Sequence, residues 1–562
     1  MRATSIVFVL AAVLAGCSNG GASADFAPGD AAGGALPPGA DPPPPACLSS
    51  SECPTGWTCN DFHVCMPPSP GGDGGVPPET ELEAGPPIGA QRFVYVAMTA
   101  QNKLARIDGE SLAVASTAVG AAPREVATIP GSDGAVVIDS TNGTAAVVRP
   151  VLTGGDGMRV LATLPALNRI DVAPTGQFAV LWFDLAKALR ENTGHAGSFQ
   201  DVAVVSLARG QEKAVALTVG FRPRAVAFDA AGARAYVITQ DGVSVIDLAA
   251  ATQDAPHLVP PIAVADPSIS PDDLEVQIVA TGDYAAVRQA GRANLRVVSL
   301  RADSPGRAFD IPLASVPTDI DLAPDGSRVY AVERDAQRLA IIDIPADAIN
   351  PAGVEVVNFA PAAAGSLALS PDGARALLFT NATLDPHITL VDLARPGFPH
   401  VTWQLQKAVR SVGIAPDGAT AIVIAAKAPG DPATATTIED FIARSFGYSL
   451  LDLSSGFAKL QLTPVDPGPF VYAPDGATAY VALDGGDSVT ATRALQVVAA
   501  RTGVVRALPL GSPPSAVGIV PSAKQAFVAQ RHPQGRMSFI ALDTGAIRTV
   551  TGFDLNSQIV DH

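Results

Sequence analysis

The chain has 562 residues, of which 48% are hydrophobic and 16% are charged, so it can bury a large core. Its 54 acidic residues outnumber its 37 lysines and arginines, which gives a formal net charge of −17. This charge argues against a nucleic-acid-binding protein, because contacts to phosphates require a basic surface, and against a polybasic membrane-surface protein. We attribute the acidity to solubility rather than to cation binding.

Residues 1–16 have the pattern of a secretory signal peptide. A positive charge at Arg2 is followed by a short apolar run, Ile6–Val13, and by small residues before Cys17. The run is too short to cross a bilayer as a helix. If Cys17 is not lipidated, the segment would be an ordinary signal peptide followed by a chance cysteine, or a signal anchor.

The tetrapeptide Leu-Ala-Gly-Cys that ends at Cys17 resembles the bacterial lipobox, in which the cysteine becomes the acylated N-terminus after cleavage. The resemblance implies a lipoprotein that carries palmitate-type acyl chains on Cys17. Ser18 stands where an Asp would imply retention in the inner membrane, so the expected location is the outer membrane of the cell envelope. Several acyl chains anchor firmly where a single chain is marginal.

Two spacers flank a cysteine-rich segment. Residues 17–46 are rich in Gly, Ala and Pro, and residues 66–90 are rich in Gly and Pro, which predicts flexible or extended connections. The segment between them, residues 47–65, holds four cysteines at even spacing: Cys47, Cys53, Cys59 and Cys65. In an exported protein this pattern predicts two disulfides, with three possible connectivities. The alternative is a zinc site assisted by His63, although no Cys-x-x-Cys pair is present.

The sequence around these cysteines, with Cys, Pro-Thr-Gly, Trp and Cys in that order, resembles small Cys-knot-like modules of cell-surface proteins. A segment this short cannot build a hydrophobic core, so disulfides would have to hold it together.

From residue 91 to residue 562 one phrase recurs, an apolar run followed by Pro-Asp-Gly and a second apolar run. The clearest copies are Leu322–Gly326, Leu369–Gly373, Ile414–Gly418 and Tyr472–Gly476, and weaker copies are Ile129–Gly134, Val172–Gly176 and Phe228–Gly232. The repeat implies an array of similar units, which decides the fold class. Each aspartate is expected to cap its own turn, so the four Pro-Asp-Gly aspartates are not interpreted as a ring of catalytic carboxylates.

Residues 318–344 show what one unit contains. Alternating apolar and polar residues predict a strand, Pro324-Asp325-Gly326 predicts a tight turn, and Val329–Val332 and Leu339–Ile344 predict two further strands. A fourth strand follows each unit before the next begins. Four short antiparallel strands per unit predict a single all-β propeller, with a β-sandwich as the alternative.

The Pro-Asp-Gly turn, the Tyr-Val strand (Tyr236-Val237, Tyr480-Val481) and the Val-Ile-Asp-Leu strand (Val245–Leu248) resemble bacterial YVTN-type repeats, within the broader lactonase-like propellers. The resemblance covers residue 93 to the C-terminus and implies architecture rather than activity. Ten second-to-third-strand hairpins can be identified, and we predict seven or more blades, up to about ten. Residues 557–561 are a candidate for a strand that closes the ring onto its first hairpin.

Three long loops between second and third strands are expected on one face, opposite the Pro-Asp-Gly turns, and surface loops on a rigid scaffold are where binding residues gather. The loops are Asp184–Gln200, Lys427–Tyr448 and Asp484–Arg493. Their candidate binding residues are Arg190, Glu191, His195, Glu439, Asp440, Arg444, Tyr448, Asp484 and Asp487. Residues 437–446 show helix-like spacing and predict a short helix that lids the channel, with its apolar side packed on the blades. Insertion without function is the alternative.

No motif for a catalytic nucleophile, a phosphate loop, haem attachment or a metal site is present, and Asp484-Gly485-Gly486-Asp487 lacks the full calcium-loop pattern. The sequence therefore predicts a membrane-anchored, extracytoplasmic propeller without cofactor that binds a protein, glycan or envelope partner. The alternative is a lactonase-like hydrolase with its site at the propeller channel, a function that fold analogy alone supports weakly.

Overall fold

The structure is a computed structural model that describes residues 88–151, 157–191, 197–253, 258–485 and 492–552. It also describes the backbone of two short strands, Thr58–Cys59 (β1) and Cys65–Met66 (β2), which pair antiparallel with Cys59 opposite Cys65. These two strands belong to a compact unit of their own, separate from the unit that holds the remaining strands.

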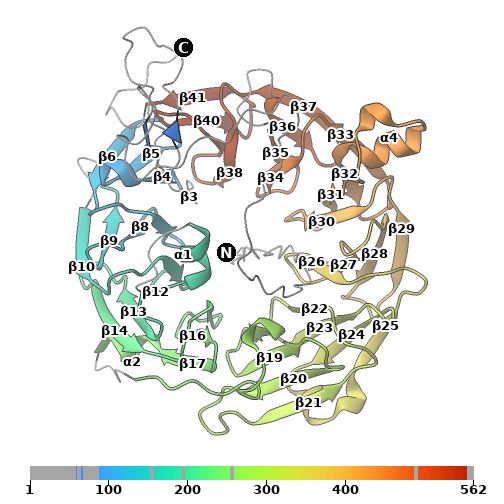
Figure 1. The fold of residues 1–562 in the computed structure, drawn as a ribbon, viewed down its shortest axis with the longest axis horizontal. Helices are drawn as coiled ribbons and strands as arrows, with labels where there is room; N and C mark the ends of the chain where they lie inside the picture. The colour runs from blue at the N-terminus through green and yellow to red at the C-terminus, as the bar shows by residue number, and fades with distance from the viewer. Residues whose placement is uncertain are drawn as a thin grey trace, which may run out of the picture. The chain divides into compact units, whose positions relative to one another are not determined.

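Ten antiparallel sheets are arranged radially around a common axis and form a ten-bladed β-propeller (Figure 1). Nine of the sheets have four strands, and blade 4 has three. All ten hairpins predicted from the sequence are confirmed, and the count exceeds the roughly four to eight blades usual for propellers.

Each blade is built from strands that are consecutive in the sequence, with the first strand nearest the axis and the last at the outer edge. The innermost strands are Ile88–Gly89 (β3), Glu125–Thr128 (β7), Arg169–Val172 (β11), Ala225–Phe228 (β15), Leu274–Ile278 (β18), Asp319–Leu322 (β22), Ser366–Leu369 (β26), Val409–Ile414 (β30), Pro467–Tyr472 (β34) and Pro514–Val520 (β38). The second strands are Phe93–Met98 (β4), Ala135–Asp139 (β8), Phe178–Trp182 (β12), Arg234–Thr239 (β16), Tyr284–Gln289 (β19), Arg328–Glu333 (β23), Arg375–Phe379 (β27), Thr420–Ala425 (β31), Thr478–Asp484 (β35) and Gln525–Gln530 (β39).

The third strands are Lys103–Asp108 (β5), Thr144–Arg149 (β9), Asp201–Ser206 (β13), Gly242–Asp247 (β17), Asn294–Ser299 (β20), Arg338–Asp343 (β24), His387–Asp392 (β28), Phe446–Asp452 (β32), Arg493–Ala499 (β36) and Arg536–Ala541 (β40). The outer strands are Val114–Ala118 (β6), Gly157–Ala162 (β10), Lys213–Thr218 (β14), Ala308–Pro312 (β21), Glu355–Asn358 (β25), His400–Gln404 (β29), Ala458–Thr463 (β33), Val504–Pro509 (β37) and Ile547–Thr551 (β41). Short helices lie in the connections: Leu185–Arg190 (α1), Leu248–Gln253 (α2), Ala346–Ile349 (α3) and Ile438–Arg444 (α4), with 3-10 turns at Thr99–Gln101, Pro271–Asp273, Pro351–Gly353 and Pro432–Thr434.

The Pro-Asp-Gly turns join first to second strands, as predicted. In each of the four, the aspartate Oδ1 accepts the backbone N–H two residues later, at 2.9 to 3.0 Å. The glycine that follows has a positive φ, for example +70° at Gly326, a conformation that glycine adopts without strain. These aspartates are therefore turn caps, and they do not form a carboxylate ring.

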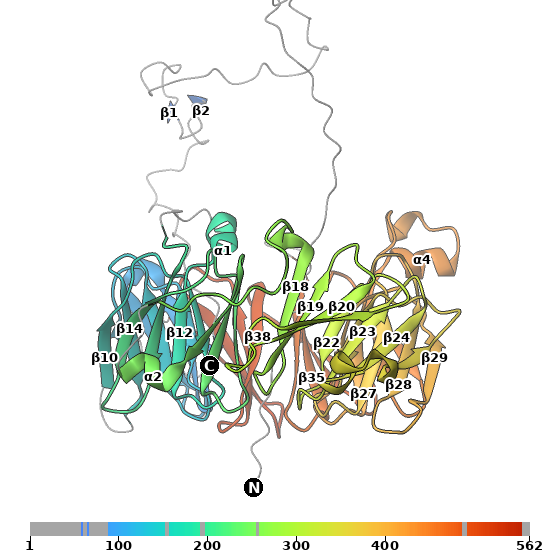
Figure 2. The same cartoon turned by 90° about the horizontal axis from the view of Figure 1, so that it is seen from below.

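The two faces of the ring differ in what they carry. Helices α1 and α4 project from one face, because both lie in connections between second and third strands (Figure 2). We call this the α1 face, and the opposite face, which carries the first-to-second-strand turns, the Pro-Asp-Gly face. The sequence prediction that the long loops share one face is confirmed for these two.

The hydrophobic core lies between neighbouring blades rather than inside any one sheet. One cluster, for example, joins Val136 and Val147 of blade 2 to Leu181 and Val205 of blade 3. Strand β8 is buried along its whole length, since both of its faces pack against a neighbour. Full burial of such side chains stabilises the fold by roughly 1.5–3 kcal/mol each.

Within the described residues, the ring closes through contact between blade 10 and blade 1, and each of these blades consists of its own consecutive strands. Val94 and Ile107 of blade 1 pack with Phe527 and Phe539 of blade 10 in one buried cluster. The first-strand position of blade 1 is filled by β3, which begins at Ile88. Residues 557–561, predicted as a closing strand, lie outside the described residues.

Among the described residues, blade 4 has no regular outer strand. Its place is taken by a single bridge in which Val243 and Ile262 exchange two backbone hydrogen bonds of 2.9 and 2.8 Å. The two residues before Ile262 are Pro260 and Pro261, which have no N–H to donate to a ladder. The prolines therefore account for the shortened pairing.

Candidate functional site

Helix α1 is held at its base by a polar network from three elements. The Asp184 carboxylate caps the helix by accepting the backbone N–H of Lys187 at 3.0 Å. The buried Lys187 ammonium pairs with Glu125 of β7 and donates to the backbone carbonyl of Asn168 at 2.9 Å. Asn168 in turn accepts the N–H of Asp184 at 2.6 Å. These bonds attach α1 to the inner strands of blades 2 and 3.

A second pair of contacts extends this network along β11. Arg169 donates to the Asp184 carboxylate at 3.0 Å, and the Trp182 indole N–H donates to Asp171 at 2.6 Å. Burial raises the pKa of Asp171 above its ordinary value, and the Trp182 hydrogen bond and the Arg169 charge only partly offset that effect. The base of α1 is therefore held by several charged side chains that are joined by hydrogen bonds and ion pairs.

The exposed end of α1 is directed toward the ring axis on the α1 face (Figures 1 and 2). Leu189 is 58% exposed, and Arg190 and Glu191 are also exposed. The structure thus places both of these predicted charged residues at a protruding position. His195 lies outside the described residues.

A row of aromatic rings continues from the base of α1 to the surface. Phe183 and Phe199 pack edge to face with centroids 5.7 Å apart, and Phe199 lies 6.0 Å from Phe221. Phe221 is 41% exposed although its backbone is fixed by Asp241 and Gln240 of the next blade. We define the α1 rim as Leu189, Arg190, Glu191, Phe199 and Phe221.

Helix α4 differs from the prediction in both position and packing. It lies at the outer edge of the ring rather than over the axis, so it does not lid the channel (Figure 1). Its apolar side is packed only in part, because Ile442 is half-buried whereas Ile438 is 73% and Phe441 45% exposed. The sequence spacing indicated a helix correctly, but it could not indicate the direction in which the 20-residue connection leaves the blade.

The predicted charged residues of α4 stabilise the helix itself. Arg444 pairs with Asp440 at 2.7 Å and donates to the Thr434 hydroxyl at 2.9 Å, while Glu439 lies exposed in the first turn. The buried Lys407 donates to the carbonyls of Ile442 and Ala443 at the helix C-terminus, and burial lowers its pKa to about 8.

Tyr448 is not a loop residue, and its assignment to the binding face is wrong. It lies in β32, fully buried, and its hydroxyl donates to Gln496 of blade 9 at 2.8 Å. Burial raises its pKa well above the ordinary value. Asp484 ends β35 and pairs with Arg531 at 2.8 Å, and Asp487 lies outside the described residues.

Three acidic residues on the innermost strands of blades 5 and 6 were missed by the sequence reasoning. Glu275 pairs with Arg288 at 2.7 Å, and Asp319 accepts the backbone N–H of Leu367 at 2.9 Å. Burial raises the pKa of Asp319 to about 6. The pKa of Asp321 rises to about 7 through burial and through the charges of Asp319 and Glu275. Asp321 can therefore hold or release a proton near neutral pH.

An alignment of the repeats could have identified Asp321. Asp321 precedes its Pro-Asp-Gly phrase at a position where blades 7 and 8 have Ala368 and Gly413. Only blade 3, with Asp171, places another acid there. Small residues suit the crowded inner edge of a blade, so an acid at that position is a departure from the repeat.

The described ranges contain neither a cluster of metal ligands nor a helix that could span a membrane. Within them, no three His, Cys, Asp or Glu side chains are grouped as metal ligands would be. The helices there are all too short or too polar to cross a bilayer.

Comparisons with known proteins do not assign the chain to a family. No family model and no curated protein matches the chain. Among solved structures, a eukaryotic initiation factor is 10% identical over 77% of this chain and 96% of its own, with a TM-score of 0.46. The dihydro-heme d1 dehydrogenase NirN is 12% identical over 74% and 72%, with a TM-score of 0.40. The β-propeller domain of Myceliophteria thermophila Cps50 (Swd1) is 13% identical over 57% and 93%, with a TM-score of 0.34.

Proposed function

We propose that this protein is a lipid-anchored, extracytoplasmic propeller that binds a protein or glycan partner of the cell envelope through the α1 rim. The strongest support is that Leu189 and Phe221 are exposed while the base of helix α1 is buried and held by hydrogen bonds. Exposed apolar and aromatic side chains on a rigid support lose little conformational entropy when a partner covers them. That is the property expected of a recognition surface rather than of an inserted loop.

The proposed lipid anchor and envelope location are based on the sequence around Cys17. The two spacers would allow the propeller to lie at a distance from the membrane. Metabolic labelling with a palmitate analogue tests this part. We expect label on the wild-type chain and none on a Cys17→Ala variant, whereas label retained by the variant would refute the lipid anchor. Fractionation of labelled cells would then assign the inner or the outer membrane.

The cysteine-rich segment supplies a further element of the proposal. The four cysteines Cys47, Cys53, Cys59 and Cys65 would form two disulfides, for which three connectivities are possible. Mass spectrometry of a non-reduced digest distinguishes the three. Four free thiols with bound zinc would support the zinc alternative.

The hydrolase alternative would use the carboxyl groups at the ring axis. Asp319 and Asp321, with pKa values of about 6 and 7, have the raised values that acid–base residues need. A lactone hydrolysis assay on the wild-type chain and on Asp321→Asn tests it. Turnover that the variant loses would favour the hydrolase over the binding protein.

Affinity capture from envelope extracts tests the binding function. The full chain is used as bait beside a Leu189→Asp/Phe221→Ser variant of the α1 rim. The matched control is Ile349→Asp, since Ile349 is 68% exposed at the end of α3, in a third-to-fourth-strand connection on the Pro-Asp-Gly face. We expect a partner that the control recovers and the rim variant does not. Equal recovery by both variants would refute recognition through the α1 rim.

A further inference from the structure

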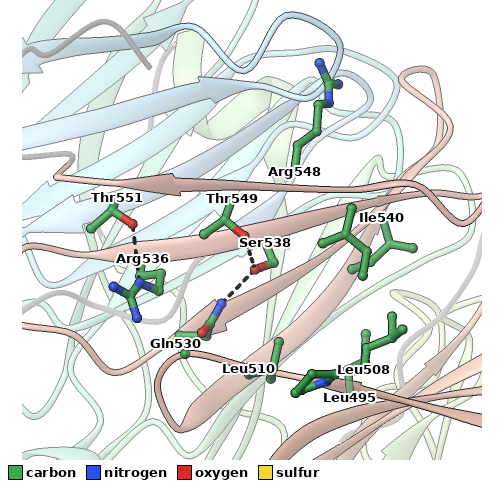
Figure 3. Close-up of a pocket in the computed structure, with 13 residues that line it drawn as sticks. Leu495, Leu508, Leu510, Gln530, Arg536, Ser538, Ile540, Arg548, Thr549 and Thr551 are labelled. Carbon is green, nitrogen blue, oxygen red and sulfur yellow. Dashed lines mark hydrogen bonds between the residues drawn. The ribbon is translucent and has the colours of Figure 1, made fainter. Parts of the chain in front are cut away.

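A groove opens between blades 9 and 10, away from the α1 rim. It has a volume of about 390 Å³, which lies in the range of roughly 300–1,000 Å³ typical of small-molecule sites (Figure 3). One side is apolar and comes mainly from blade 9, with Leu495, Leu508 and Leu510. Ile540 of blade 10 extends this apolar surface.

The other side is a row of polar groups on blade 10. Gln530 donates to the Ser538 hydroxyl at 2.8 Å, and Ser538 shares a hydrogen bond of 2.8 Å with Thr549 (Figure 3). Gln530 and Ser538 are 5% and 3% exposed, and Gln530 also accepts the N–H of Ser512. Because these groups satisfy one another, the polar wall is already organised before any ligand enters.

Two arginines flank the groove, and neither is neutralised by a carboxylate within the described part of the chain. Arg536 donates only to the hydroxyls of Thr551, at 3.3 Å, and Ser512, at 2.8 Å. Arg548 donates only to the backbone carbonyl of Glu110 at 2.8 Å. None of the 13 lining residues is acidic, although the whole chain has a net charge of −17.

The groove therefore combines an apolar wall with an unneutralised cation in a strongly acidic protein. We propose that it binds a small amphipathic carboxylate, with the carboxylate on Arg536 and the aliphatic body against the leucines of blade 9. Two hydroxyl contacts hold the Arg536 guanidinium in place, and they leave its Nη2 group to donate to the carboxylate. A charge-assisted bond of this kind is stronger than a bond between neutral groups. The site is independent of the partner proposed for the α1 rim.

Calorimetric titration of the full chain with sodium decanoate, beside decanol as a neutral probe of the same length, tests the proposal. We expect one decanoate per chain and binding of decanol weaker by about tenfold or more, the factor that a charge-assisted hydrogen bond provides. Arg536→Gln is expected to weaken decanoate binding by a similar factor and to leave decanol unaffected. Leu510→Trp, which fills the groove without changing its charge, should weaken both.

Arg506→Gln is the matched control, because Arg506 is an exposed arginine of β37 that donates to the Gly545 carbonyl and does not line the groove. It should bind decanoate as the wild type does. Circular dichroism melting of each variant confirms that it is folded. Equal affinity for decanoate and decanol, an unaffected Arg536→Gln variant, or no binding at all would overturn the proposal.

Discussion

The Arg548 guanidinium in the last strand of blade 10 donates a hydrogen bond of 2.8 Å to the backbone carbonyl of Glu110 in blade 1, 438 residues earlier in the sequence. A second bond across the same junction runs from the Ser522 N–H to the Gln91 carbonyl, also at 2.8 Å. Neither bond belongs to a strand ladder. Among the described residues the ends of the ring are therefore joined by isolated hydrogen bonds and by the buried apolar cluster, and we expect the cluster to contribute most of the stability of the junction.

Truncation of the junction cluster should accordingly destabilise the protein far more than loss of the polar contact. Phe539 is fully buried there, so Phe539→Ala should lower the free energy of unfolding by about 3–5 kcal/mol. Arg548→Ala removes an exposed bond and should lower it by about 1 kcal/mol or less. Urea denaturation of both variants measures the difference. Similar losses would mean that the cluster does not hold the junction.

The stability of the protein should depend on pH through Asp321. Its pKa is about 7 in the folded chain and ordinary in the unfolded chain, so the folded state binds the proton more tightly. The contribution of Asp321 to the free energy of unfolding is therefore fully present below about pH 4 and is lost as the pH rises to about 7. Asp321→Asn should therefore raise the melting temperature at pH 8 and have little effect at pH 4. Thermal melts across that range measure this, and a pH-independent effect would contradict the assignment.

Asp325, whose pKa is shifted in the opposite direction, serves as the control for the pH dependence predicted for Asp321. Its pKa lies below the ordinary value, because its carboxylate accepts the backbone N–H and the hydroxyl of Ser327. Its contribution is present at neutral pH and is lost as the pH falls through the folded-state pKa. Asp325→Ala should therefore destabilise the protein at pH 7 by about 1 kcal/mol, and by less near pH 3.

The blade turns pack closely against their neighbours, which two glycines can demonstrate. Gly373 has a φ of +68°, and a Cβ there would lie 2.7 Å from the Cδ atom of Pro324 in the preceding blade. Gly397 has a φ of +75° with nothing within 4 Å of such a Cβ. Gly397→Ala should cost about 1–2 kcal/mol for the backbone conformation alone, and Gly373→Ala distinctly more. Equal costs in denaturant would contradict the close packing of the turns.

The rigid mounting of α1 depends on Lys187. Replacing this residue with methionine keeps the bulk of the side chain and removes its bonds to Glu125 and the Asn168 carbonyl. We expect the amides of Leu185–Arg190 to exchange with deuterium about tenfold faster or more in Lys187→Met, as measured by mass spectrometry. Peptides from α4 should be unchanged. Unchanged exchange in α1 would mean that Lys187 does not hold the helix.

The architecture could be predicted because it depends on local chemistry. Pro-Asp-Gly sets a turn, and alternation sets the strands beside it, so all ten hairpins and the capping role of Asp325 followed from neighbouring residues. The errors concern long-range placement. The direction of α4 and the burial of Tyr448 against Gln496 depend on residues far along the chain. The α1 rim was predicted only in part, because Phe221 reaches it from a different connection than Arg190 does.

Site-specific photocrosslinking in cells tests the central claim, recognition through the α1 rim, most directly. A benzoylphenylalanine would be incorporated in place of Leu189 in one strain and in place of Ile349 in another, at positions that are 58% and 68% exposed on opposite faces. We predict one discrete, light-dependent adduct at Leu189 that disappears with Phe221→Ser, and none at Ile349. A discrete adduct only at Ile349, or none at Leu189, would contradict the account.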